Sequence, residues 1–141
     1  MYNIILDTNI LLSAFLFKGF SRKIIDQIVE EKLSLFISQE LKKEVLRKFK
    51  ELGASKEASD KLLFLLENKA ILYEPRIKIS VCRDKQDNFI LELAETSKAE
   101  FIITRDKDLL DLLNKKWKKT KIVKPEDFLT KIRRRSEKTP T

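Results

Sequence analysis

The chain has 141 residues, of which 30 are Lys or Arg and 22 are Asp or Glu, so its formal net charge is +8. It contains no His and only two Gly, which excludes histidine-activated nucleophiles, histidine-bound zinc and glycine-rich nucleotide loops. Any catalysis must therefore use carboxylates, hydroxyls, Lys, Arg or a metal ion. The length fits one domain, and the basic charge favours polyanionic partners such as nucleic acid.

Compartment signals are few but agree with one another. The single Cys82 cannot form an internal disulfide and is compatible with a reducing compartment. The first residues lack the basic and apolar regions of a signal peptide, and no apolar run approaches ~18 residues. These features predict a cytoplasmic protein that has no membrane partner.

Strand-like and helix-like segments alternate along the chain. Apolar runs predict strands at 3–6, 33–37, 70–73, 101–104 and 121–123. Helical spacing predicts helices at 10–17, 21–29, 38–49, 56–68, 86–97 and 109–113, and a last helix that begins at Pro125. This alternation predicts an α/β fold, a three-layer α/β/α sandwich with a mostly parallel central sheet, over residues 1–132.

Two stretches fit this pattern less well. Residues 77–81 alternate like an exposed edge strand but lead directly into charged residues. Residues 133–141 have no apolar side chain, so we expect a basic, flexible C-terminal tail.

Acidic residues follow two of the predicted strands. Asp7 comes after the first strand, Asp106 comes after the strand at 101–104, and Asp87 stands at the start of the helix at 86–97. The carboxyl ends of parallel strands meet at one edge of a sheet, where ligands bind in α/β folds. Carboxylates gathered there need a cation, and oxygen-only ligands select Mg²⁺ or Mn²⁺. Such a site is equipped for metal-assisted phosphodiester hydrolysis.

Each acid also has an ordinary structural role open to it. Asp7 and Asp106 suit helix N-caps, which contribute ~1 kcal/mol each. Asp84 and Asp87 fit an N-cap and N3 pair before their helix.

Glu44 lies on a Lys-rich helix, where the simplest expectation is an exposed ion pair with Lys48 one turn later. If Glu44 does not reach the acidic edge, Glu40 is the alternative residue on that helix.

Four motifs together resemble those of PIN-domain ribonucleases, above all the PIN-family toxins of prokaryotic toxin–antitoxin systems. They are Asp7-Thr8-Asn9 after the first strand, Glu44 within 38–46, and the segments 87–94 and 104–110. The ordered set is more specific than any one motif, and it spans most of the chain.

The resemblance implies Mg²⁺- or Mn²⁺-dependent endonucleolytic cleavage of single-stranded RNA. The residues implied as metal ligands and catalytic groups are Asp7, Glu44, Asp87 and Asp106, with Thr104 and Asn9 as supporting polar groups and Asp84 and Asp108 as further candidate ligands. It also implies an antitoxin partner and a homodimer. Arg105 departs from the pattern, because many relatives in this group carry Gly there.

Basic residues near the C-terminus supply candidate RNA contacts. Lys side chains surround Trp117 in 115–124, and they can hold phosphates while the indole stacks on a base. The predicted RNA-binding residues are Arg105, Lys107, Lys116, Trp117 and Lys119. The competing interpretation is that Trp117 packs on the edge of the core while the lysines only solubilise the surface.

Two other functional classes compete with a ribonuclease. One is a PIN-like module that binds nucleic acid without cleaving it, although four acids in order argue against this. The other is a flavodoxin-like signalling domain that is phosphorylated on an aspartate, which the segment 104–106 suits poorly.

Overall fold

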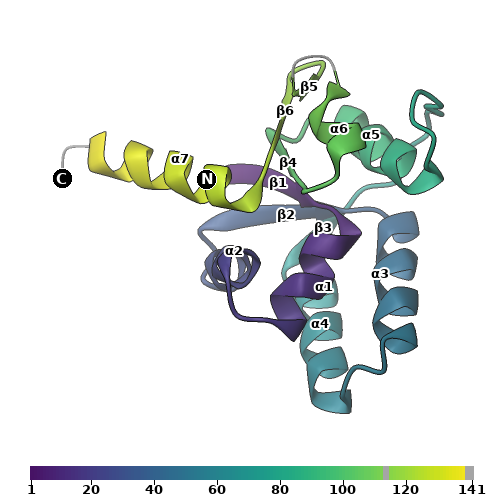
Figure 1. The fold of residues 1–141 in the computed structure, drawn as a ribbon, viewed down its shortest axis with the longest axis vertical. Coiled ribbons are helices and arrows are strands. Elements are labelled where there is room, and N and C mark those ends of the chain that lie inside the picture. The colour runs from purple at the N-terminus through teal and green to yellow at the C-terminus, as the bar shows by residue number, and fades with distance from the viewer. Residues whose placement is uncertain (113–114, 139–141) are drawn as a thin grey trace.

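The computed structural model describes residues 1–112 and 115–138, in which strands and helices alternate along the chain (Figure 1). The strands are β1 (Tyr2–Leu6), β2 (Leu33–Ile37), β3 (Ala70–Leu72), β4 (Phe101–Ile103), β5 (Lys116–Trp117) and β6 (Thr120–Val123). The helices are α1 (Thr8–Leu16), α2 (Phe20–Val29), α3 (Gln39–Glu51), α4 (Lys56–Asn68), α5 (Lys85–Ser97), α6 (Lys107–Leu110) and α7 (Pro125–Lys138).

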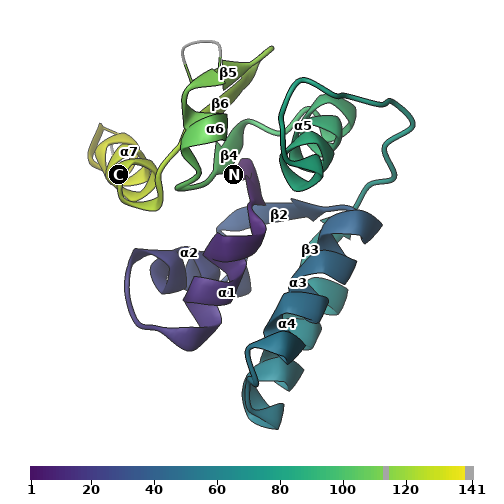
Figure 2. The same ribbon diagram turned by 45° about the vertical axis from the view of Figure 1, so that its right-hand side comes forward.

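The strands form a six-stranded sheet in the order β3-β2-β1-β4-β6-β5. Every neighbouring pair is parallel except β5 and β6, which form an antiparallel hairpin. Helices α1 to α4 lie on one face of the sheet, whereas α5 and α6 lie on the other (Figures 1 and 2). The predicted three-layer fold with a mostly parallel sheet is therefore confirmed.

The apolar runs become strands that are buried on both faces, as a parallel sheet covered by helices requires. In β1, Ile4, Ile5 and Leu6 are all buried, and in β4 the whole run from Phe101 to Ile103 is buried. The rings of Tyr2, Phe101 and Phe128 pack edge to face and join the last helix to the sheet. This packing holds the adjacent strands β1 and β4 as a rigid base for the residues that follow them.

The sheet reverses direction between β1 and β4. From β1 the chain continues outward to β2 and β3, and α5 then carries it back to β4 on the other side of β1. Ligands of open α/β sheets bind at such a reversal, beyond the carboxyl ends of the strands. Asp7 and Asp106 follow these two strands.

The segment 77–81, which alternates like an edge strand but could not be assigned from sequence, does not form a strand. Its backbone bonds to side chains of α5 instead. The Ile79 N–H donates to Glu92 at 3.0 Å, and Asn88 accepts from the Cys82 N–H at 2.9 Å and donates to the Cys82 carbonyl at 3.1 Å. The backbone of this segment thus bonds to a helix rather than to a strand.

The last helix runs past the domain boundary predicted at residue 132. Residues 133–138, the first part of the segment expected to be a basic, flexible tail, continue α7. Arg, Glu and Lys are good helix formers, so an existing helix can extend through them without apolar contacts. The predicted end of the helix at residue 113 and the tail residues 139–141 lie outside the described residues.

None of the helices described within 1–112 and 115–138 combines the length and the apolar character needed to cross a membrane.

Candidate active site

Asp7 and Thr104 are side by side because their strands are in register. Leu6 of β1 lies opposite Ile103 of β4, so the next residue of each strand emerges at the same edge of the sheet. The Thr104 hydroxyl donates to Oδ2 of Asp7, and both side chains are buried. The other oxygen, Oδ1, accepts from the backbone N–H of Asn9 at 2.7 Å and of Ile10 at 3.4 Å. Asp7 therefore caps α1, as the structural interpretation predicts, and also faces the carboxyl edge.

Thr104 also fixes the position of Asp106. Its Oγ1 accepts from the backbone N–H of Asp106 at 3.0 Å, while Asp106 caps the short helix α6 by accepting from the Asp108 N–H at 2.9 Å. One buried hydroxyl thus joins the two acids that follow β1 and β4. Burial raises the pKa of the Asp7 carboxyl despite its hydrogen bonds, and the charge of Asp106 raises this pKa further.

Asp87 is the third acid at this edge, and it enters from the first turn of α5. Its side chain is only 4% exposed, and its Oδ2 is buried without a hydrogen-bond partner among the described residues. Burial, followed by the charge of Asp106 and then that of Asp84, raises the pKa of Asp87 to about 7. A buried carboxylate without a partner is costly, so this side chain either holds a proton or needs a cation.

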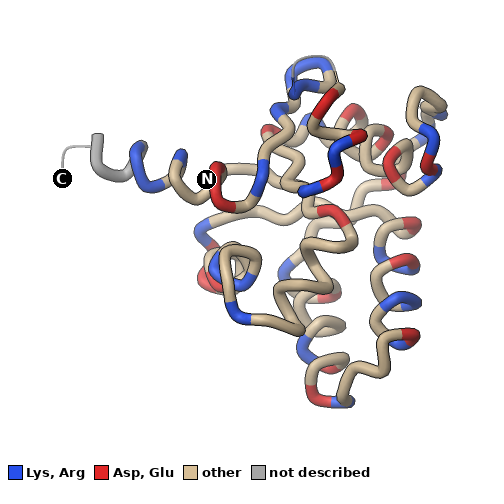
Figure 3. The backbone as a smooth tube through the Cα atoms, in the orientation of Figure 1, with Lys and Arg blue, Asp and Glu red and all other residues tan. Residues whose placement is uncertain are grey.

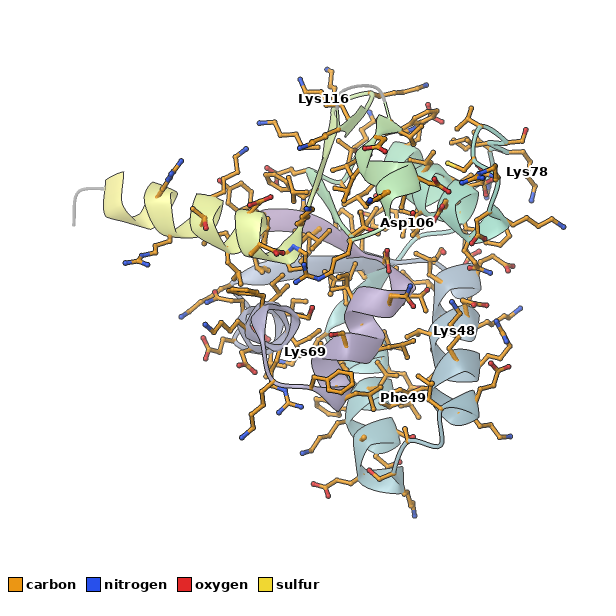
Figure 4. The ribbon with its side chains drawn as sticks, in the orientation of Figure 1. Lys48, Phe49, Lys69, Lys78, Asp106 and Lys116 are labelled. Carbon is orange, nitrogen blue, oxygen red and sulfur yellow. The ribbon has the colours of Figure 1, made fainter. Side chains whose placement is uncertain are left out.

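Carboxylate oxygens of Asp87, Asp106 and Asp108 lie within 4.8 Å of one another. Asp106, labelled in Figure 4, lies near the first turn of α1, and Figure 3 shows acidic segments where α1, α5 and α6 begin. Oxygen ligands at this spacing, one of them buried without a partner, fit a hard divalent cation. The side chains present therefore fit a metal ion, with Asp7 adjacent to them through its interaction with Asp106.

Asp108 is the most exposed member of the cluster, and it has a counter-ion. Arg83 donates to both of its carboxylate oxygens, at 3.1 and 3.0 Å. Asp84, the remaining candidate ligand, caps α5 by accepting from the Gln86 N–H at 2.9 Å, and it is exposed. Its charge acts on Asp87, but its hydrogen bond with the Gln86 N–H is that of a helix cap.

Glu44 is not the exposed residue that a Lys-rich helix leads one to expect. It is 7% exposed, and its Oε1 accepts from Arg47 at 2.8 Å and lies 3.4 Å from the Lys48 ammonium. Its Oε2 accepts from the side-chain amide of Gln86 at 3.2 Å. The expected pair with Lys48 is present, but the contact with Gln86, the neighbour of Asp87, also brings Glu44 to the start of α5.

Residues that hold the acids in place were not predicted. Three side chains donate hydrogen bonds to candidate ligands: Gln86 and Arg47 to Glu44, and Arg83 to Asp108. Only Arg47 had a sequence signal, its spacing of three residues from Glu44 on one helix. The other two contacts depend on how α5 packs against α3 and α6.

Comparison with known proteins identifies this arrangement. The family model of the PIN domain matches residues 3–108, which include every acid described above. The chain belongs to the PIN-domain family. A protein of unknown function from Methanocaldococcus jannaschii, MJ1680, is similar, with 36% identity over 118 residues that span 77% of this chain and 74% of the relative.

Solved structures share the fold of this PIN domain at low sequence identity. PAE2754 from Pyrobaculum aerophilum has a TM-score of 0.58 and 20% identity, over 93% of this chain and 89% of that chain. VapBC2 from Rickettsia felis, solved bound to a DNA fragment from its promoter, has a TM-score of 0.55 and 15% identity, over 86% and 97%. FitAcB from Neisseria gonorrhoeae has a TM-score of 0.52 and 17% identity, over 87% and 98%.

The residues predicted to bind RNA lie in several places on this PIN domain. Arg105 follows β4 and pairs with Glu126 at 2.8 Å. Lys107 begins α6, whereas Lys116 and Lys119 are exposed on the β5–β6 hairpin, and Figure 4 shows Lys116 far from Asp106. Trp117 is half-buried against the core, with its indole N–H buried and unpartnered within the described residues. This packing agrees with the structural interpretation of Trp117.

Asn9, predicted as a supporting polar group, is exposed beside Asp7 on the first turn of α1. Its backbone N–H serves the cap, which leaves the side-chain amide facing solvent at the acidic edge.

Proposed function

We propose that this PIN domain is a Mg²⁺- or Mn²⁺-dependent endoribonuclease that hydrolyses phosphodiester bonds in single-stranded RNA. PIN domains are nucleases that use divalent metal ions. The observation that carries the proposal is the gathering of acids at this edge: Thr104 joins Asp7 to Asp106, and Asp106 lies within 4.8 Å of Asp87, one oxygen of which has no partner among the described residues.

The residues that would hold the ion are Asp7, Asp87 and Asp106, with Glu44 as the ligand from α3 and Asp108 at the solvent side. A bound ion at such a site lowers the pKa of a water molecule and stabilises the charge that develops on phosphate.

The protein's own side chains prepare this site. Thr104 orients the carboxylate of Asp7 by donating to Oδ2, and it keeps Asp106 close by accepting from its N–H. Gln86 orients Glu44 through its side-chain amide. The exposed amide of Asn9 is positioned to hydrogen-bond to a phosphate oxygen of a bound strand.

We further propose that the chain is the toxin of a toxin–antitoxin pair and acts in the cytoplasm. The likeness in fold to VapBC2 and FitAcB supports a protein antitoxin as partner. A homodimer is also proposed. Ile71 and Leu72 are each 47% exposed on β3, which is the strand at one edge of the sheet, and Phe64 on the neighbouring α4 is 57% exposed. Light scattering of the purified chain measures the oligomeric state.

The deciding experiment has two steps on the purified chain. Calorimetric titration of Mn²⁺ should show saturable binding that Asp7→Asn weakens, whereas Asp60→Asn, which changes an exposed acid on α4, should not. Incubation with single-stranded RNA, double-stranded RNA and single-stranded DNA should then give cleavage of the first alone, and EDTA should stop it. Metal binding without cleavage would favour the non-catalytic nucleic-acid-binding module.

A further inference from the structure

A cavity beside the acidic edge differs in charge from two other cavities of the molecule. It has a volume of about 220 Å³ and lies between the α1–α2 turn and Arg105. Three cations line it, Lys18, Arg22 and Arg105, and none of its lining residues is acidic. By contrast, acids and cations alternate around the 540 Å³ cavity between α2 and α4 and around the 340 Å³ cavity beside α6. The cavity beside Arg105 therefore presents a purely positive surface.

Two aromatic rings stand at the same turn. Phe17 is 67% exposed and Phe20 is 46% exposed, and both line the cavity together with the cations. The ammonium of Lys23 lies over the ring of Phe20, 5.6 Å from its centroid. Exposed aromatic rings interleaved with cations are the equipment with which proteins bind single-stranded nucleic acid, because bases stack on the rings and phosphates pair with the charges.

Helix α1 connects the acidic edge to the cavity. Asn9 and Ser13 are spaced by four residues and share one face of that helix, Phe17 is its C-cap residue, and all three are at least partly exposed. Eight residues of helix span about 12 Å. Arg105, which also lines the cavity, lies between Thr104 and Asp106 in the chain. A strand that occupies the acidic edge thus meets this cavity next.

The three cations differ in how accessible they are to a phosphate. Lys18 forms no ion pair within the described part of the chain. Arg22 uses its Nε to donate to the Ala14 carbonyl at 3.1 Å, which fixes the side chain against α1. Arg105 pairs with Glu126, whose side chain is 36% exposed, so this pair is accessible to solvent and easily exchanged.

We propose that the α1–α2 turn, with Phe17, Lys18 and Phe20, together with Arg105, forms the binding track for the RNA strand that flanks the scissile phosphate. This inference rests on the proposed ribonuclease function and adds a substrate site to it. Phe17 and Phe20 stack on unpaired bases, while Lys18 and Arg105 contact phosphates. The track selects single strands, since bases within a duplex cannot reach the rings.

The test measures the anisotropy of a fluorescein-labelled oligouridine 12-mer in EDTA, so that binding is separated from cleavage. Phe17→Ala and Phe20→Ala should each weaken binding about tenfold, and Lys18→Ala should lower the slope of log K against log salt by about 0.7. Leu52→Ala at the end of α3 and Lys61→Ala on α4, which change exposed residues away from the track, should leave the Kd within about twofold of wild type. Melting temperatures of all variants should match, because the changed side chains are exposed.

The outcomes separate this inference from the proposed function. With Mn²⁺ present, the Phe variants should raise KM and leave kcat nearly unchanged. A wild type that cleaves RNA, with Phe variants that bind and cleave equally well, overturns the track and assigns the aromatic turn to a protein partner. A wild type that binds through Phe17 and Phe20 but does not cleave overturns the ribonuclease and keeps the track. Failure of the wild type to bind the 12-mer overturns the track as well.

Discussion

Asp87→Asn should stabilise the metal-free protein at neutral and alkaline pH. Asp87 is buried, one of its oxygens has no partner within the described residues, and its nearest charges are those of Asp106 and Asp84. An amide of the same shape removes one charge from this cluster and can donate to Asp106, as the protonated acid does. The substitution should therefore remove repulsion without leaving a cavity.

The size of the effect follows from the pKa of Asp87, which rises from 3.8 to about 7 on folding. The folded state binds the proton more tightly than the unfolded state, so the wild type loses stability as pH increases from 3.8 toward about 7. Each pH unit in that window costs about 1.4 kcal/mol, which sets a ceiling on the order of 4 kcal/mol above pH 7. The pKa belongs to the Asp87–Asp106 pair, so Asp106→Asn should recover part of the same energy.

Urea denaturation in EDTA at pH 4.5 and pH 8 measures this difference. The stabilisation by Asp87→Asn should be largest at pH 8 and fall to about a quarter of that value at pH 4.5, where Asp87 of the folded wild type is protonated but that of the unfolded chain is mostly ionised. Asp60→Asn serves as the control and should show neither effect. Adding Mn²⁺ at pH 8 should stabilise the wild type and leave the variant almost unchanged. Equal stability of wild type and variant at pH 8 would refute the reasoning, because the charge of Asp87 would then not destabilise the folded protein.

Three further predictions concern activity. Asp7→Asn should abolish cleavage, measured on single-stranded RNA, while circular dichroism shows an intact fold. Glu44→Gln should lower kcat at least tenfold, which corresponds to about 1.4 kcal/mol of activation free energy. A wild-type rate would show that Glu44 has only a structural role on α3. Thr104→Val, which keeps the shape but removes the hydroxyl, should reduce both Mn²⁺ affinity and kcat, and unchanged values in calorimetry and kinetics would show that Thr104 does not orient Asp7.

The fold could be predicted because its parallel strands are continuous apolar runs. Ile4 to Leu6 and Phe101 to Ile103 are buried on both faces, and such continuous apolar runs can be recognised from the sequence alone. The segment 77–83 could not be assigned in this way. Its conformation is set by Asn88 and Glu92, which bond to its backbone from a helix later in the chain. Period-two alternation cannot distinguish a strand partner from a helix partner.

The candidate site was predictable to the level of the strand ends. Asp7 and Asp106 follow strands, and the carboxyl ends of adjacent parallel strands lie at the same edge of the sheet. The position of Glu44 was not predictable from its own helix, because that helix is rich in Lys and its local pattern favours an exposed ion pair. Packing of α3 against α5 decides the matter, since it buries Glu44 and places its Oε2 against Gln86. A contact between residues 44 and 86 has no signature in either segment alone.

The counter-ions explain why a cation belongs at the centre of this cluster rather than at its rim. Glu44 at one side is neutralised by Arg47, and Asp108 at the other is neutralised by Arg83. Among the side chains described in residues 1–112 and 115–134, no Lys or Arg forms a salt bridge with Asp7, Asp87 or Asp106. Asp7 and Asp87 are buried and Asp106 is half-buried beside them, so the charge without a basic partner is concentrated where it is hardest to solvate. A divalent ion at that point would offset a cost that none of these basic side chains offsets, and it would leave Glu44 and Asp108 paired with their arginines.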